Sequence, residues 1–274
     1  MGKVFTWDEL RLGRIPALEN FKKVQAMIRA TILDTPAIVS ALLFGSVVRG
    51  DYTIRSDVDC VVLYRHGSQE AALAATNEIA FAAQELHVPL NFVPCDTILA
   101  RTRLHHLGTA FRQHLRSSID AGGLIKGDLM KSLVATVSQR HEIESYLKMK
   151  AYSIQESMMQ TSAMSDERMA AFLKKALEAP VHVARKMLMY NDVLDGDSVQ
   201  DVQERFREVM SPSLADRLDK LIELDRWYSA ALESQMHCPS REHYDLTIEH
   251  LEEATPEVLD FLRFNILLLS KARQ

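Results

Sequence analysis

Two short apolar runs, residues 37–44 and 60–64, flank a polar segment and constrain the fold more than any other feature of the chain. Each run has the length and composition of a buried strand. The connecting residues, 45–59, are rich in glycine, serine and aspartate, which are residues typical of turns. The pattern therefore predicts two adjacent buried strands that are joined by a polar connection.

The connecting segment carries two carboxylates, Asp57 and Asp59, where the second apolar run begins. Side chains alternate in direction along a strand, so these two project to one face, about 7 Å apart along the chain. A divalent metal fits between them. At the other end of the segment, Gly45 and Ser46 form a turn that opens a short helix, and free N–H groups at such a turn commonly bind phosphate. A phosphate site that faces a pair of metal ligands indicates phosphoryl or nucleotidyl transfer.

The same residues carry a resemblance to a known family. From Gly45 to Asp59 the chain follows the pattern GSxxxGxxxxxSDxD, with Gly50 and Ser56 at its inner positions. This pattern resembles the signature of the DNA polymerase beta-like nucleotidyltransferase superfamily. Small members, including aminoglycoside nucleotidyltransferases and minimal nucleotidyltransferases, show the same spacing. The resemblance covers residues 35–127.

The resemblance implies a Mg²⁺-dependent nucleotidyltransferase. Asp57 and Asp59 would hold one or two Mg²⁺ ions that bridge the phosphates of a nucleoside triphosphate, with ATP as the expected substrate. Ser46 would hold the outer phosphates, and Gly45 would let the backbone approach them closely. By analogy, AMP would pass to a hydroxyl acceptor with release of pyrophosphate, and an aminoglycoside-like small molecule is one candidate acceptor.

Three further polar residues lie inside the motif loop. Arg49 and Arg55 can pair with triphosphate oxygens, or they can be exposed to water. Ser56 can bind the backbone around the metal site, or it can be only a turn residue. The sequence leaves both interpretations open for each of them.

The next strand brings a departure from the family pattern. Active members of the superfamily usually place a third carboxylate there, and Asn91 stands at the matching position. An amide can coordinate a metal through its oxygen, but it cannot accept a proton from the incoming hydroxyl. The third acid can come from Asp96, from Glu85 or from the helical domain. Otherwise the protein is a degenerate module that binds nucleotide with weak or no transferase activity.

The first half of the chain alternates predicted helices and strands. We expect helices over residues 17–33, 68–86, 97–106 and 109–121, and strands over 37–44, 58–64, 88–93 and 122–126. In the second half, apolar residues recur near a period of 3.6, and the expected helices span residues 130–162, 166–190, 198–210, 213–234 and 256–272.

These elements predict an α+β fold. A nucleotidyltransferase domain over residues 1–127, with a small mixed sheet flanked by helices, precedes a helical bundle over residues 128–274 that we expect to bind the acceptor. Helix starts are predicted from three pairs, namely Ser198 with Asp201, Ser213 with Asp216, and Thr255 with Pro256. Pro180 is expected to kink or divide the helix that contains it.

The second half of the chain is acidic, which indicates the charge of the acceptor. Residues 132–274 hold 17 Lys and Arg against 24 Asp and Glu, which favours a cationic small molecule. Two clusters combine carboxylates with aromatic rings, which suits such an acceptor, namely Asp225-Arg226-Trp227-Tyr228 and His243-Tyr244-Asp245 with Glu249. The alternative for each is ordinary helix surface with one aromatic residue in the core. A second class of acceptor is protein or RNA, as in toxin–antitoxin systems. It is supported by a basic segment that contains Arg101, Arg103, His105, His106, Arg112, His114 and Arg116. A nucleic acid partner is the less favoured of these alternatives.

The remaining features concern compartment. Three widely spaced cysteines form no CxxC pair, so a disulfide framework and a structural zinc site are not expected. No apolar run approaches the length of about 18 residues that a bilayer requires, and the first residues lack the apolar core of a signal peptide. We expect a cytoplasmic protein without a membrane partner.

Overall fold

The computed structural model describes residues 2–100, 109–128, 130–131 and 140–271 of the 274-residue chain. The chain separates into two compact units, which we call the sheet unit and the helical unit. The sheet unit is Pro16–Ser138, and the helical unit comprises Met1–Ile15 and Gln139–Gln274.

A four-stranded mixed sheet forms the centre of the sheet unit, as the sequence predicted. Its strands are β1 (Ile38–Phe44), β2 (Val58–Tyr64), β3 (Leu90–Asp96) and β4 (Leu124–Lys126), in the order β3-β2-β1-β4. β1 is antiparallel to β2 and β4, and β2 is parallel to β3. β3 begins two residues later than expected because Pro89 has no N–H for the ladder, although its carbonyl accepts a bond from the Val58 N–H at 2.8 Å.

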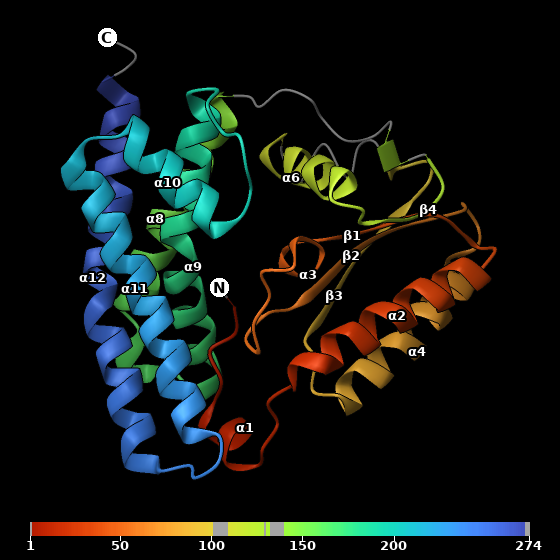
Figure 1. Ribbon diagram of the computed structural model, residues 1–274, viewed down its shortest axis with the longest axis horizontal. Coiled ribbons are helices and arrows are strands. Elements are labelled where there is room, and N and C mark those ends of the chain that lie inside the picture. The colour runs from red at the N-terminus through yellow and green to blue at the C-terminus, as the bar shows by residue number, and fades with distance from the viewer. Residues whose placement is uncertain (1, 101–108, 129, 132–139, 272–274) are drawn as a thin grey trace. The chain divides into compact units, whose positions relative to one another are not determined.

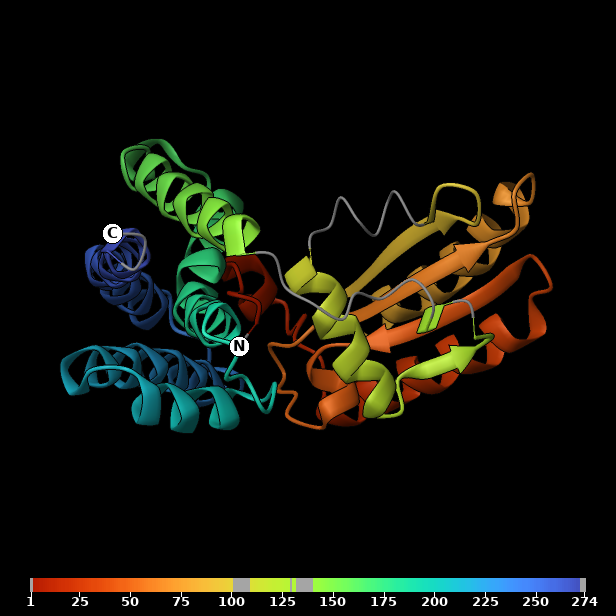
Figure 2. The same cartoon turned by 90° about the horizontal axis from the view of Figure 1, so that it is seen from above.

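Helices cover both faces of this sheet (Figure 1). α2 (Leu18–Asp34) and α4 (Gln69–Glu85) lie on one face, and α6 (Thr109–Asp120) lies on the other, as a second view also shows (Figure 2). The alanines of α4 that face the core, among them Ala72, Ala75 and Ala83, let this helix approach the sheet closely. Between β1 and β2, the chain forms only one turn of helix, α3 (Ser46–Arg49). Residues 101–106 of the helix expected over 97–106 lie outside the described residues.

Alternation along β2 separates two apolar cores. Val58, Cys60 and Val62 face α2 and α4, whereas Val61 and Leu63 face α6. Asp59 has the same parity as these last two residues and therefore belongs to the α6 face of the sheet. The helix on the same face of the sheet as Asp59 is therefore α6, not α2 or α4.

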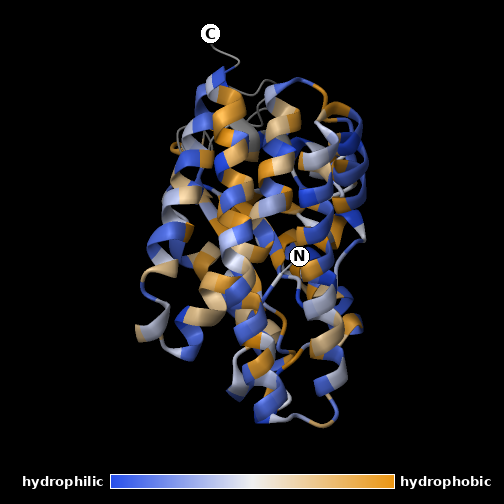
Figure 3. Cartoon of the chain, turned by 90° about the vertical axis from the view of Figure 1, so that its left-hand side faces the viewer, coloured by the Kyte–Doolittle hydropathy of each residue, from blue (hydrophilic) through white to orange (hydrophobic). Residues whose placement is uncertain are grey.

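Over its described residues, 2–15 and 140–271, the helical unit has a short helix, α1 (Trp7–Arg11), and five long ones. The long helices are α8 (Arg140–Met158), α9 (Asp166–Tyr190), α10 (Val199–Val209), α11 (Pro212–Gln235) and α12 (Arg241–Lys271). Hydrophilic residues recur along the helices of this unit (Figure 3). Among the described helices, none combines the length and the hydrophobicity that crossing a membrane requires.

The first fifteen residues group with the helices, whereas the predicted boundary at residue 127 places them with the sheet. The Phe5 N–H donates a hydrogen bond to the Tyr228 hydroxyl at 3.0 Å, and the Tyr244 hydroxyl donates to the Phe5 carbonyl at 3.2 Å. Both bonds are buried, and so are the side chains of Val4 and Phe5. The apolar segment therefore obtains its backbone partners from α11 and α12.

One predicted helix start is confirmed, and two are wrong. Ser198 caps α10 in a capping box with Asp201, as predicted. α11 starts instead at Pro212, with Ser211 as its cap residue, because proline is favoured in the first helical turn. α12 starts at Arg241, well before Thr255.

Two prolines, Pro256 and Pro180, lie inside helices, and neither of them starts or ends its helix. α12 continues through Pro256, which cannot donate to the carbonyl of Glu252 four residues earlier. The Thr255 hydroxyl donates to that same carbonyl at 2.7 Å and so replaces the missing bond. Pro180 does not divide α9, which runs unbroken from Asp166 to Tyr190.

Candidate active site

The site begins where β1 turns sharply after Phe44. Gly45 has φ +83° and ψ −160°, a conformation that is essentially restricted to glycine. A methyl group on Gly45 would lie 3.2 Å from the Asp59 carboxylate oxygen Oδ2. The turn and this carboxylate are thus in close contact, and the backbone conformation and the space both call for glycine.

The short helix after the turn is closed by Gly50. Its N–H donates to the Ser46 carbonyl at 2.8 Å, and it adopts a left-handed conformation with φ +83°. The Gly45 carbonyl accepts long bonds from Val48 at 3.2 Å and from Arg49 at 3.3 Å. Ser46 is the first residue of this helical turn and directly follows Gly45. Its side chain and its N–H group therefore lie at the end of the helix that is near Asp59.

Asp59 pairs across the sheet with residues of both neighbouring strands. Its Cα partner in β1 is Phe44, and its partner in β3 is Asn91. The Asn91 amide nitrogen donates a hydrogen bond of 3.0 Å to Asp59 Oδ1. Asn91 is exposed and Asp59 is partly exposed, so ligands can reach this pair from solvent.

A comparison with protein families concerns the segment that carries these residues. Residues 28–111 match the family model of the nucleotidyltransferase domain, and this segment includes β1, β2 and β3. Residues 28–111 thus form a nucleotidyltransferase domain, which is consistent with a member of the DNA polymerase beta-like superfamily. The family indicates a transferase enzyme that handles nucleotides. A search among curated proteins returns no match.

Asp57 stands one residue before β2 of the nucleotidyltransferase domain and is partly exposed. Cys60, on the other side of Asp59, points into the opposite core. Burial raises the pKa of the Cys60 thiol far above its usual range, and the charge of Asp59 raises it further. The thiol therefore stays protonated and has no part in the chemistry of the carboxylates.

The loop residues of the motif hold the loop itself together. The Ser56 hydroxyl accepts a bond from the Thr53 N–H at 2.9 Å, and the Ser56 N–H donates to the Thr53 carbonyl at 3.0 Å. Arg49 forms an ion pair with Asp51 at 3.2 Å. Arg55 and Ser56 are each only 1% exposed, which favours a structural role for both in the absence of nucleotide.

α6 adds an aromatic wall on the face of the sheet to which Asp59 belongs. The rings of Phe44 and Phe111 meet edge to face with centroids 5.4 Å apart, and His114 meets Phe44 in the same way at 5.9 Å. The sequence pointed to His114 only as part of a basic segment. Its position above Phe44, whose strand pairs with Asp59, follows from helix packing that a sequence pattern does not reveal.

Two residues of the sheet unit, Asp96 and Glu85, are candidates for the third acid, and neither lies beside Asp59. Asp96 ends β3, five residues beyond Asn91 and so about 16 Å along the strand, and it pairs with His66 Nδ1 at 2.9 Å. The hydrogen bond from His66 lowers the pKa of Asp96. Glu85 ends α4 on the opposite face of the sheet. Among the described residues, no three His, Cys, Asp or Glu side chains form a metal-binding group.

The donor atoms nevertheless fit a hard divalent cation. Asp57 and Asp59 offer carboxylate oxygens, which Mg²⁺ prefers. Asn91 currently presents its NH₂ group to Asp59, and a rotation of the amide would present its oxygen instead. The residues that would hold Mg²⁺ are therefore the two aspartates, with Asn91 as a neutral neighbour.

The structure separates the residues of the other sequence-predicted surfaces. Arg101, Arg103, His105 and His106 of the basic segment lie outside the described residues, whereas Arg116 is exposed on α6. In the helical unit, Trp227 and His243 line one pocket. Their neighbours Tyr228 and Tyr244 instead bind the backbone of Phe5.

Proposed function

We propose that the nucleotidyltransferase domain transfers a nucleoside monophosphate, with AMP as the expected group, from a Mg²⁺-bound triphosphate to a hydroxyl acceptor. The contact between the Gly45 turn and the Asp59 carboxylate supports this proposal. A triphosphate that follows the turn from Ser46 would lie next to the residues that would hold the metal. The expected compartment is the cytoplasm, which supplies ATP.

Each residue has a role that matches its chemistry. Mg²⁺ bound by Asp57 and Asp59 would neutralise charge on the phosphates. Ser46 and the N–H groups of its turn would bind the outer phosphates. Gly45 keeps the backbone close to Asp59, and the bonds between Thr53 and Ser56 fix the loop that leads to the aspartates.

The transfer requires a place for one proton. A bond forms between the acceptor oxygen and the α-phosphorus, the bond from that phosphorus to the bridging oxygen breaks, and pyrophosphate leaves. The acceptor hydroxyl gives up its proton to solvent water or to a carboxylate, because an amide such as Asn91 cannot take it. The Asn91–Asp59 hydrogen bond therefore favours a second candidate function, which is nucleotide binding with slow or no transfer.

For the acceptor, a cationic small molecule of the aminoglycoside kind remains the favoured class, because acidic residues exceed basic ones in the second half of the chain. Transfer to protein or RNA is the alternative. Helical-unit residues would supply the acceptor site in the first case.

The test is turnover of ATP labelled on its α-phosphorus, with Mg²⁺, in the presence of an aminoglycoside panel, total RNA or a protein extract. Label on an aminoglycoside supports the favoured acceptor, and label on RNA or protein supports the alternative. Triphosphate binding without turnover in any arm supports the second candidate function. No binding of ATP in the presence of Mg²⁺ would overturn the proposal.

A further inference from the structure

One face of α8 presents a stripe of large apolar side chains to solvent. Met149, Tyr152 and Met159 are 73%, 68% and 81% exposed, and no other large hydrophobic side chain of the described residues is more exposed than these three. Their spacings of three and seven residues place them on one face of the helix. Single exposed apolar residues are common on protein surfaces, whereas a contiguous group marks an interaction site.

Two opposite charges lie on the same face, at equal distances from Tyr152. Lys148 is four residues before it and Glu156 is four residues after it, and both are exposed. Lys148 pairs with Glu144 of its own helix at 2.6 Å, whereas Glu156 has no ion-pair partner among the described residues. The face therefore has an aromatic ring at its centre and one charge of each sign on either side.

This arrangement is complementary to itself. When two identical helices pack antiparallel about a twofold axis, the residue on the axis meets its own copy, and residues equally far before and after it meet each other. An axis at Tyr152 places Lys148 of each chain opposite Glu156 of the other. The same axis places the two methionines of the stripe opposite uncharged side chains, namely Gln155 and Ser145.

Other arrangements of two α8 helices bring like charges together. A parallel pair would place Lys148 opposite its own copy and Glu156 opposite its own copy, and both contacts are repulsive. An antiparallel pair with its axis at Met149 would place Lys148 opposite Lys150 and Glu156 opposite Glu142. The charges therefore favour the antiparallel pair with the tyrosine on the axis.

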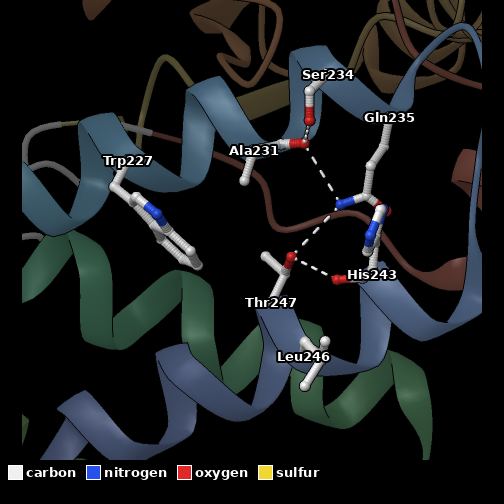
Figure 4. Close-up of a pocket in the computed structure, with 7 residues that line it drawn as sticks. All are labelled: Trp227, Ala231, Ser234, Gln235, His243, Leu246 and Thr247. Atoms are coloured by element: carbon white, nitrogen blue, oxygen red, sulfur yellow. Dashed lines mark hydrogen bonds between the residues drawn. The ribbon is translucent and has the colours of Figure 1, made fainter.

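A pocket of the helical unit lies elsewhere, between α11 and α12 (Figure 4). None of its lining residues belongs to α8, so a small molecule bound there would leave the stripe exposed. Methionine and tyrosine are enriched at protein interfaces, where methionine adapts to the shape of its partner. The composition of the stripe thus suits a protein partner.

We propose that the chain forms a homodimer in which α8 packs antiparallel against α8 of a second copy, about a twofold axis at Tyr152. Two Lys148–Glu156 ion pairs flank the apolar contact and fix its register. A single pair of helices is a small interface, so the dimer should dissociate at micromolar concentrations. Dimer formation requires neither nucleotide nor Mg²⁺, so its test is independent of nucleotidyl transfer.

Charge reversal tests the pairing. Sedimentation equilibrium of the full-length chain should show monomer and dimer in equilibrium. Lys148→Glu and Glu156→Lys should each weaken the dimer about tenfold, because each reversal turns both ion pairs into repulsions. A mixture of the two variants should associate as tightly as the parent, since every facing pair then has opposite charges, and a folding defect would not be rescued in this way. Lys220→Glu, at an exposed position of α11, is the matched control and should change nothing.

Disulfide crosslinking tests the axis. Cys238→Ser removes the exposed cysteine, and the remaining Cys60 and Cys95 are buried. In that background Tyr152→Cys should form a disulfide-linked dimer on mild oxidation, because its two copies meet at the axis. Ser145→Cys is the control, since its two copies lie about 21 Å apart along the antiparallel pair and should not be linked. A chain that stays monomeric, a mixture that associates no better than either variant alone, or equal linkage through both cysteines would overturn the proposal.

Discussion

The Asn91 amide donates a 3.0 Å hydrogen bond to Asp59 Oδ1 across the parallel pair β2 and β3. A carboxylate at position 91 would face Asp59 at the same distance and would repel it unless a cation lay between them. The amide therefore stabilises the metal-free site, and it places no proton-accepting carboxylate at position 91. This one side chain links the stability of the site to its reactivity.

Replacement of Asn91 by Asp should make stability depend on Mg²⁺. Without metal, the two close carboxylates should destabilise the fold by about 1–3 kcal/mol at neutral pH, and Mg²⁺ should restore most of that loss. Thermal unfolding with and without Mg²⁺ measures the effect. Asn91→Ala is the control, since it removes the hydrogen bond without adding charge and should not create metal dependence. The same Asp variant should turn over ATP faster if a third acid limits the reaction.

Gly45→Ala should damage both stability and metal-dependent nucleotide binding. The variant forces an L-residue into φ +83° and places a methyl group 3.2 Å from Asp59 Oδ2, at a cost of about 1–3 kcal/mol. Gly50→Ala provides the comparison, because Gly50 has the same φ but nothing within 4 Å of an added methyl group. Urea unfolding and ATP titration should show a binding defect for Gly45→Ala that exceeds that of Gly50→Ala. Equal binding defects would contradict the contact with Asp59.

Tyr228→Phe should destabilise the helical unit. The substitution leaves the buried N–H of Phe5 without its 3.0 Å partner, which costs about 1–3 kcal/mol. Tyr152→Phe is the control, since Tyr152 is 68% exposed on α8. Chemical denaturation followed by circular dichroism gives both values. If the two variants are equally stable, the first residues do not dock as described.

Lys186 should make stability rise with pH. Burial, together with the positive charges of Arg185 and Lys150, lowers the pKa of Lys186 to about 7, and its Nζ lies 3.8 Å from the ring centroid of Tyr146. In the unfolded chain the lysine pKa is about 10.4. Between these values the unfolded state binds more protons than the folded state, so the free energy of unfolding increases with pH across this window.

Lys186→Met should remove this rise, and the variant should gain most in stability over the parent at or below neutral pH. Urea unfolding from pH 6 to 10 gives the comparison, with Lys220→Met, at an exposed position of α11, as the matched control. Identical pH profiles for the parent and Lys186→Met would contradict the lowered pKa.

The sequence predicted the sheet and the motif because short-range patterns encode them. The alternation around Asp59 and the two flanking apolar runs appear in the structure as β1 and β2, and the helices α8 to α12 occupy most of the second half of the chain. The sequence predicts that Asn91 occupies the position of the third carboxylate on the next strand, and in the structure Asn91 pairs with Asp59. These features depend on neighbours within a few residues or on the family pattern.

Other features depend on partners that are remote in sequence. Phe5 obtains its backbone partners from Tyr228 and Tyr244, more than two hundred residues away. The course of α12 depends on a Thr255 hydroxyl that replaces the bond lost at Pro256, so a proline that predicted a helix start lies inside a helix. The packing of His114 above Phe44 likewise arises only when α6 covers the sheet.

The central claim is that Asp57 and Asp59 together hold the Mg²⁺ of a bound triphosphate. Titration of ATP into the parent chain and into the double variant Asp57→Asn with Asp59→Asn, each with and without Mg²⁺, tests it most directly. Asp96→Asn is the matched control, because Asp96 lies at the far end of β3. We predict Mg²⁺-dependent binding in the parent and in Asp96→Asn, and its loss in the folded double variant. Undiminished Mg²⁺-dependent affinity in the double variant would contradict the assignment.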